Sequence, residues 1–296
     1  MKLHLGVLPT LGILSAALCL GPEAASAQQG LRRIASDGAT VRDLVRQLRS
    51  ADGPQVRPKV IGDDSANTSF LFAAAGSVQG SGGTYFRSDV SIINHRSSDQ
   101  RIAVGWLAQG VDNSNDPVQY FMIPARTPLI LADFVANTLS KSGLGAILIL
   151  GQTSSGAADS LAQLGGFSRI WTNQPGASGT VSQGFPSVSI IDSVGSGAAI
   201  ALGNRHDSQY RTNVGIVNLD SVSHTWTVSI NGLHGSGSFQ VTVPPVSMKQ
   251  AGLPSGDYGD VALAFQTTGS GFYWSAYGAS VDNISGDSWS SHASQP

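Results

Sequence analysis

The chain has 296 residues, of which 41% are hydrophobic and only 12% are charged, and its formal net charge is −2. That length can bury one large core or two medium ones, and the near-neutral charge excludes the concentrated basic face of a nucleic-acid-binding protein. The 36 glycines indicate short strands joined by many turns rather than helices.

The first residues have the form of a secretory signal peptide. Lys2 precedes an apolar run over residues 5–20, and residues 25–27 read Ala-Ser-Ala, the small-x-small pattern that signal peptidase accepts. The run is too short to be a good transmembrane anchor, and no other stretch is long enough to span a bilayer. We therefore expect residues 1–27 to be removed and the protein to be secreted to the extracellular space, with the periplasm as the alternative compartment.

Residues 28–68 are predicted to form a short helix and a polar linker. Ser36 or Asp37 is a suitable N-cap for the helix. Such a helix either docks on the following domain or contacts an anionic surface, and its short length and narrow apolar face favour docking. Its apolar residues recur at helical spacing: Val41, Leu44, Val45 and Leu48.

A nine-residue pattern occurs twice, at residues 86–94 and 210–218. Each copy reads aromatic, Arg, hydroxyl residue, Asp or Asn, Val, then small or aliphatic residues and a closing Asn. The alternation predicts a strand that buries one side, with Val90, Ile92 and Asn94 on the same face in the first copy. We therefore expect two copies of one β-module.

The two modules are predicted at residues 69–187 and 198–290, with a tail at 291–296. Many short strands, regular turn signals and no alternating helices favour an all-β fold. We expect two tandem immunoglobulin- or fibronectin-like antiparallel β-sandwiches after the signal peptide and helix. A single closed barrel built from both halves is the structural alternative. The first module carries longer loops, most obviously the Ala/Ser/Gly-rich insertion at residues 151–165.

Four segments of the second half carry a resemblance to a known group. They are residues 211–218, 233–235, 243–245 with Gln250, and 279–287. They resemble a functionally uncharacterised group of secreted bacterial proteins in which tandem immunoglobulin-like β-modules follow a signal peptide. The first half departs from the group at its end, where the acidic turn is missing. The resemblance implies a fold and a compartment, and it implies no reaction.

Signatures of catalysis and of metal binding are sparse. The only cysteine, Cys19, and the only glutamate, Glu23, both lie in the leader, and the histidines lack metal-ligand spacing. There is no Gly-x-Ser-x-Gly elbow. We therefore expect a protein that is not an enzyme and has no cofactor.

The arginine of each nine-residue pattern is the sharpest candidate. Arg87 and Asp89, like Arg211 and Asn213, lie two residues apart on one strand face. A guanidinium in this position either binds an anionic ligand or clamps a loop of its own module, such as the turn at residues 282–287. Repetition at equivalent places favours the structural clamp. This interpretation predicts that truncation of Arg211 lowers stability rather than affinity.

The turn in the second half offers four oxygen-bearing side chains. Calcium takes such ligands, but the same residue types also cap the backbone of ordinary tight turns. The turn interpretation is favoured, with calcium as the alternative. The four residues are Asp282, Asn283, Ser285 and Asp287.

Three tryptophans fall within predicted strands: Trp106, Trp226 and Trp274. If exposed in a row they could stack on sugar rings, whereas large aromatics more often fill sandwich interiors. Trp289 is expected near the surface.

These observations favour a secreted, non-enzymatic surface or matrix protein that acts in adhesion or assembly through the loops of its modules. Its partner would be another surface or matrix protein or a glycan. The alternatives are a pair of carbohydrate-binding modules and a hydrolase with an unfamiliar Asp/Ser/His site.

Overall fold

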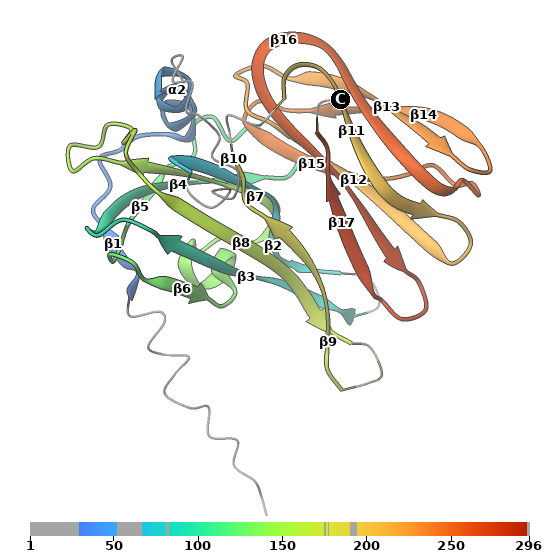
Figure 1. Ribbon diagram of the computed structural model, residues 1–296, viewed down its shortest axis with the longest axis horizontal. Coiled ribbons are helices and arrows are strands. Elements are labelled where there is room, and N and C mark those ends of the chain that lie inside the picture. The colour runs from blue at the N-terminus through green and yellow to red at the C-terminus, as the bar shows by residue number, and fades with distance from the viewer. Residues whose placement is uncertain are drawn as a thin grey trace, which may run out of the picture.

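The described part of the chain is mostly antiparallel β-structure (Figure 1). This confirms the all-β class. The expected signal peptide and most of the expected linker lie outside the described residues, so both stay predictions. The computed structural model describes residues 30–51, 67–80, 83–174, 176, 178–189 and 194–294.

The strands before residue 190 form one sheet that folds over on itself. Its order is β1-β5-β4-β7-β2-β3-β8-β9, with β10 beside β2 and β6 beside β3. Strand β2 pairs with β7 along most of its length and with β3 only at Val78 and Gln79. The sheet turns over there and gives two facing layers. Its strands are β1 (Arg32–Ile34), β2 (Ser69–Gln79), β3 (Tyr85–Asn94), β4 (Gln100–Ala108), β5 (Gln119–Ile123), β6 (Pro128–Leu131), β7 (Gly143–Gln152), β8 (Leu164–Asn173), β9 (Thr180–Pro186) and β10 (Val188–Ser189).

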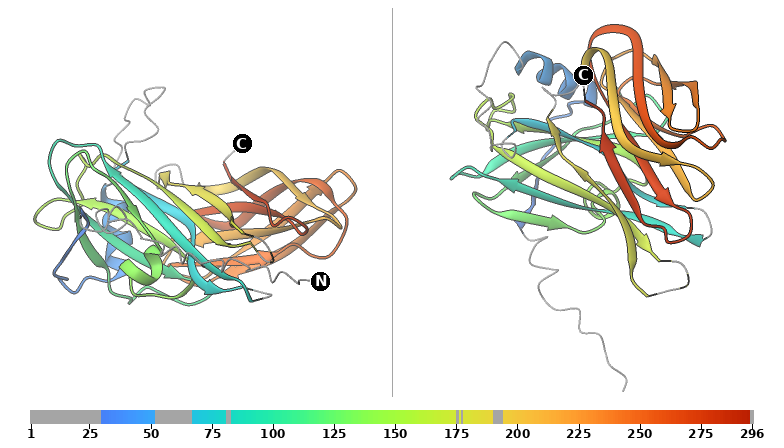
Figure 2. Two further views of the ribbon diagram at one scale, coloured as in Figure 1. Left: turned by 90° about the horizontal axis from the view of Figure 1, so that it is seen from below. Right: turned by 45° about the vertical axis from the view of Figure 1, so that its right-hand side comes forward.

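The remaining strands form a second sheet with the order β14-β13-β16-β12-β15, to which β11 and β17 add through β16. Strand β16 passes from one layer to the other: its first part pairs with β13 and β11, and its last part pairs with β12 and β17 (Figure 2). The strands are β11 (Val194–His206), β12 (Tyr210–Asn218), β13 (His224–Gly232), β14 (Ser236–Val243), β15 (Ser247–Gly252), β16 (Gly259–Asp282) and β17 (Ser288–His292).

The strand pairings of the first sheet correspond to those of the second sheet. Strand β3 lies between β6 and β8, and β12 lies between β15 and the end of β16. Strand β4 lies between β5 and β7, and β13 lies between β14 and the start of β16. The difference is that β7 and β8 are separate strands joined by the loop at 153–163, whereas β16 runs through. That loop falls within the expected insertion.

Each sheet encloses its own hydrophobic core between its two layers. Val90 and Ile92 of β3 are buried in the first core, and Val214 and Ile216 of β12 are buried in the second. The period-2 alternation along each strand places these residues inward, as the sequence predicts. Both halves are therefore sandwich-like.

Helix α2 (Val41–Ala51) forms where helical periodicity predicts it. Its cap differs from the expected one: the Asp43 side chain accepts the Thr40 N–H at 3.0 Å, and Thr40 Oγ1 accepts the Asp43 N–H at 3.4 Å. This reciprocal pair satisfies donors that the first turn leaves free. Asp37 instead accepts a bond from the Tyr120 hydroxyl at 2.7 Å. No helix among the described residues is both long and apolar enough to cross a membrane.

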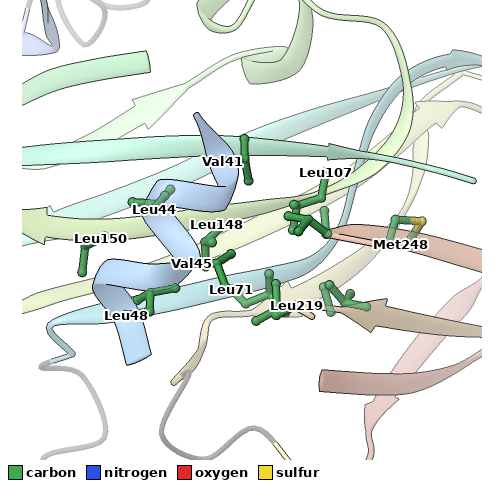
Figure 3. Packing of buried hydrophobic residues seen from close by; sticks show 14 of the residues in the cluster. Val41, Leu44, Val45, Leu48, Leu71, Leu107, Leu148, Leu150, Leu219 and Met248 are labelled. Carbon is green, nitrogen blue, oxygen red and sulfur yellow. The ribbon is translucent and has the colours of Figure 1, made fainter. Parts of the chain in front are cut away.

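A third hydrophobic cluster joins the two halves. The apolar face of α2 packs against the outer face of the first sheet, and residues of the second half close the same cluster (Figure 3). Burying each such side chain stabilises the fold by about 1.5–3 kcal/mol. The helix therefore docks, as expected, but at a junction rather than on one module. The second half contributes Val217, Leu219, Val246, Met248, Tyr277 and Ala279.

Polar contacts cross the same junction. The Gly110 N–H donates to the Met248 carbonyl at 2.9 Å, and Asn113 Nδ2 donates to the Val246 carbonyl at 3.0 Å. Arg49 of the helix lies 3.0 Å from the Asp220 carboxylate. Because apolar packing and hydrogen bonds both span the boundary, the helix and the two sandwich-like halves form one body.

The expected tail at residues 291–296 is partly wrong. Ser291 and His292 belong to β17, and Ser294 exchanges backbone hydrogen bonds with Ile200 at 2.8 and 3.1 Å. A strand edge can recruit any nearby backbone, and no side-chain pattern in such a short polar segment predicts this pairing.

Candidate functional site

The asparagine that closes each nine-residue pattern is fully buried and binds the same set of backbone groups in both halves. Asn94 Nδ2 lies 2.8 Å from the Ser98 carbonyl oxygen and 3.3 Å from those of Ile123 and Pro124. Its Oδ1 accepts the Arg96 N–H at 3.0 Å. The amide therefore ties the loop after β3 to the end of β5.

Asn218 repeats this arrangement in the second half. Its Nδ2 lies 2.8 Å from the Val222 carbonyl oxygen, 3.3 Å from that of Val243 and 2.9 Å from that of Pro244. Its Oδ1 accepts the Asp220 N–H at 2.9 Å. Both asparagines fall within the predicted strands, where no role is expected of them. The signal was present, because a polar residue on a predicted core face must find partners.

Arg87 and Asp89 both contact Asp133, the residue before the short π-helix η2 (Phe134–Thr138). The Asp133 N–H donates to Asp89 Oδ1 at 3.1 Å, and Arg87 Nε lies 3.8 Å from the Asp133 carboxylate. Asp133 has a φ of 42°, a left-handed conformation that is costly for a residue with a Cβ. The two strand residues thus hold a strained turn of their own half.

Arg211 is exposed and reaches the turn named in the sequence analysis. Its Nη1 donates to Asn283 Oδ1 at 2.6 Å. Asn213, the fourth proposed clamp residue, lies on β12 opposite Gly252 and Ala279. The structure therefore places both arginines beside loops of their own halves.

Side chains of the turn at residues 282–287 form hydrogen bonds within the turn itself. Asp282 accepts the Ile284 N–H at 2.8 Å and the Ser285 hydroxyl at 3.0 Å, and Ser285 in turn accepts the Asp287 N–H at 3.1 Å. The bond from Ile284 lowers the pKa of Asp282. This geometry favours the interpretation as a capped turn. No cluster of three or more His, Cys, Asp or Glu side chains suited to a metal ion occurs in the described ranges.

The three strand tryptophans fill the cores, which is the interpretation the sequence favours, and their alternative role in glycan stacking is wrong. Trp226 and Trp274 are 0% exposed, and Trp106 is 4% exposed. All three lie inside the cores because inward strand positions of a sandwich are filled by large apolar side chains. A sugar cannot reach their faces.

A different pair of aromatic side chains lies at the surface, beside an open depression of about 630 Å³ on the second half. Tyr210 and Trp289 meet edge to face there with ring centroids 5.8 Å apart. Trp289 Nε1 donates to the Gly203 carbonyl at 2.6 Å, which fixes the indole. Trp289 is partly exposed, as the sequence predicts for this residue.

Charged groups border these rings. The Arg205 guanidinium lies 4.4 Å from the Tyr210 ring centroid and 2.6 Å from the Asp207 carboxylate. Burial raises the pKa of Asp207, but the bond from Arg205 and two backbone N–H bonds outweigh it and lower the pKa overall. Asp260 also lines the depression and is exposed. Flat rings with fixed polar groups beside them suit a ligand with both apolar faces and hydroxyls.

Two histidines are paired with carboxylates elsewhere in the second half. His224 Nε2 lies 2.7 Å from Asp220, and His234 Nδ1 lies 2.9 Å from Asp257. The His224 ring also stacks on Phe272 at 3.9 Å. The hydrogen bonds described for these two rings include no serine hydroxyl.

Comparison with protein-family models and with curated protein sequences finds no match for this chain.

Proposed function

We propose that this chain is a secreted, non-enzymatic protein that acts in adhesion or assembly at the cell surface or in the extracellular matrix. The observation that carries the proposal is the shared hydrophobic cluster between helix α2 and both halves. A rigid body of this kind presents its loops and strand edges in fixed relative positions. That is what a binding scaffold needs, because ordering a surface in advance lowers the cost of association.

We also propose that the two halves are tandem immunoglobulin-like modules derived from one duplicated segment. The support is the parallel between the strand pairings of the two sheets and the identical roles of Asn94 and Asn218. The matching of hydrogen-bond partners, residue by residue, is what a common ancestor predicts. Export rests on the leader at residues 1–27.

The test uses the organism that makes the protein. Fractionation should find the chain outside the cytoplasm and beginning near Gln28. Deletion of the gene should reduce attachment to surfaces or retention of the matrix, and the full-length gene should restore it, whereas a gene lacking codons 2–27 should not. A cytoplasmic location, or unchanged attachment and matrix in the deletion strain, would overturn the proposal.

A glycan ligand is the second candidate, and one observation favours it. Tyr210 and Trp289 form an aromatic surface with Arg205 and Asp260 beside it. The test is a glycan array with the purified chain. Trp289→Ala should abolish any binding, whereas Trp171→Ala, which removes a partly exposed indole from the other half, should leave it unchanged. No binding on the array, or equal loss in both variants, would eliminate this candidate.

A further inference from the structure

The edges of the sheets are covered by other parts of the chain in most places. Strand β1 pairs with the outer side of β5, β10 pairs with β2, and Ser294 pairs with Ile200 of β11. Strands β9 and β17 lie beside each other, linked by a bond of 2.6 Å from Ser290 Oγ to the Gly184 carbonyl. Strand β15 meets Gln109 of the first half through a bridge at Met248.

Strand β14 is different. It pairs with β13 only, no bridge to its outer side occurs among the described residues, and it lies at the outer margin of the molecule (Figure 1). Its counterpart by position in the first sheet is β5, whose outer side β1 covers. The described part of the second half has no segment equivalent to β1 at β14. An open edge of this kind presents unpaired backbone donors and acceptors.

The geometry of the β13–β14 hairpin shows which backbone N–H and C=O groups of β14 have no partner on β13. The Gly232 N–H donates to the Gly235 carbonyl at 2.9 Å, so this pair is hydrogen-bonded. Because hydrogen-bonded pairs alternate along an antiparallel ladder, the β14 residues bonded to β13 are those at odd numbers from 237 to 243. The backbone groups of the even-numbered residues point outward: Ser236, Ser238, Gln240 and Thr242.

The composition of β14 does nothing to prevent self-pairing. Natural edge strands carry lysine, proline or a bulge as protection against pairing with another chain. Residues 236–243 read Ser-Gly-Ser-Phe-Gln-Val-Thr-Val, with no charge and no proline, and their register with β13 has no shift. A second copy of an uncharged strand meets no like-charge repulsion.

We propose that β14 pairs antiparallel with β14 of a second copy of this chain, forming a two-fold dimer. Placing the axis at Phe239 sets Ser238 opposite Gln240 and Ser236 opposite Thr242, which satisfies every outward N–H and C=O group of the strand. The two Phe239 rings, each half-buried against its own core, then face each other as a cross-strand aromatic pair. Such an isologous contact closes on itself and does not continue into a filament.

This inference deepens the proposed function, and it rests on assembly being part of what the chain does. The two can fail separately. A chain that dimerises through β14 but whose deletion leaves attachment unchanged would retain this inference and lose the proposed function. A chain that is monomeric but needed for attachment would retain the proposed function and lose this inference.

The experiment is sedimentation velocity of the mature chain across a series of concentrations, together with two substitutions. Wild type should show a reversible dimer. Gln240→Lys keeps every backbone bond to β13 but places a charge on the edge of each copy, and it should raise the dissociation constant by a factor of about 2–5. Ser223→Lys adds the same charge on an exposed loop and should not change the constant. A monomer at all concentrations, or a dimer unaffected by Gln240→Lys, would overturn the proposal.

The register has its own test, because the mature chain has no cysteine. Phe239→Cys places one thiol at the proposed axis and should give a disulfide-linked dimer on mild oxidation. Ser223→Cys is the control for random collision. Equal cross-linking of the two variants would refute the proposed axis.

Discussion

Replacement of the closing asparagines tests the central structural claim. Asn218 is 0% exposed, its Nδ2 lies within 3.3 Å of three carbonyl oxygens, and its Oδ1 accepts one N–H. Asn218→Ala removes all of these contacts and leaves the buried Val243 carbonyl and the partly buried Pro244 carbonyl and Asp220 N–H without this partner. Each net hydrogen bond contributes about 1 kcal/mol, and unsatisfied buried groups cost about 1–3 kcal/mol each, so we expect a loss of about 3 kcal/mol or more.

For a chain of this size, about 1 kcal/mol corresponds to about 2–4 °C in melting temperature. Asn218→Ala should therefore lower the melting temperature by about 6–12 °C, and Asn94→Ala should do the same because its partners correspond one for one. Scanning calorimetry and urea titration followed by tryptophan fluorescence measure this loss. Arg211→Ala is the control, since it removes an exposed contact and should cost about 0.5 kcal/mol or less.

The reasoning would be refuted if Asn218→Ala were no more destabilising than Arg211→Ala. A difference of several kcal/mol between the two asparagine variants would contradict their equivalence. A large loss in Arg211→Ala would instead favour the clamp that the sequence analysis assigns to the arginines.

Three further predictions concern other regions. Met248→Ala leaves a cavity at a fully buried position in the shared cluster and should lower the free energy of unfolding by about 2–5 kcal/mol. Calorimetry of wild type should show a single unfolding transition, and two well-separated transitions would contradict the shared cluster. Burial lowers the pKa of His206, and its Nδ1 accepts the Thr212 N–H at 3.1 Å. The contribution of His206 to the free energy of unfolding should therefore be complete above pH ~6.5 and should be lost as the pH falls through the lowered pKa. Urea titrations of wild type should show this pH dependence, and an equal dependence in His206→Asn would contradict it. Millimolar calcium should leave the melting temperature unchanged because the Asp282 carboxylate already accepts hydrogen bonds within its own turn. A calcium-dependent rise in melting temperature that Asp282→Ala abolishes would instead support a calcium site there.

The shared cluster also explains why the N-terminal helix carries arginines beside its apolar face. Its inward residues are buried at the junction, while Arg49 reaches Asp220 of the second half and Arg46 pairs with Asp43 in solvent. Burial raises the pKa of Asp220, but hydrogen bonds from His224 and Arg49 outweigh it and lower the pKa overall. Arg49 thus links the helix to the second half, whereas Arg46 stays within the helix.

The helix, the strand of each nine-residue pattern and the inward face of that strand were predictable from the sequence alone. Val90 and Ile92 alternate with polar residues, and Val41, Leu44 and Leu48 recur at helical spacing. Both patterns follow from the geometry of a single element, so they require no knowledge of what packs against it. The all-β class follows from them.

Other features depended on tertiary structure. The bonds of Asn218 and the cluster around Met248 both join segments that are distant in sequence. The two-residue period of a strand shows which side chains share a face, but it does not show which distant segment covers that face. For the same reason the sequence could identify β14 as a strand, and only the assembled sheet could show that its outer edge is open.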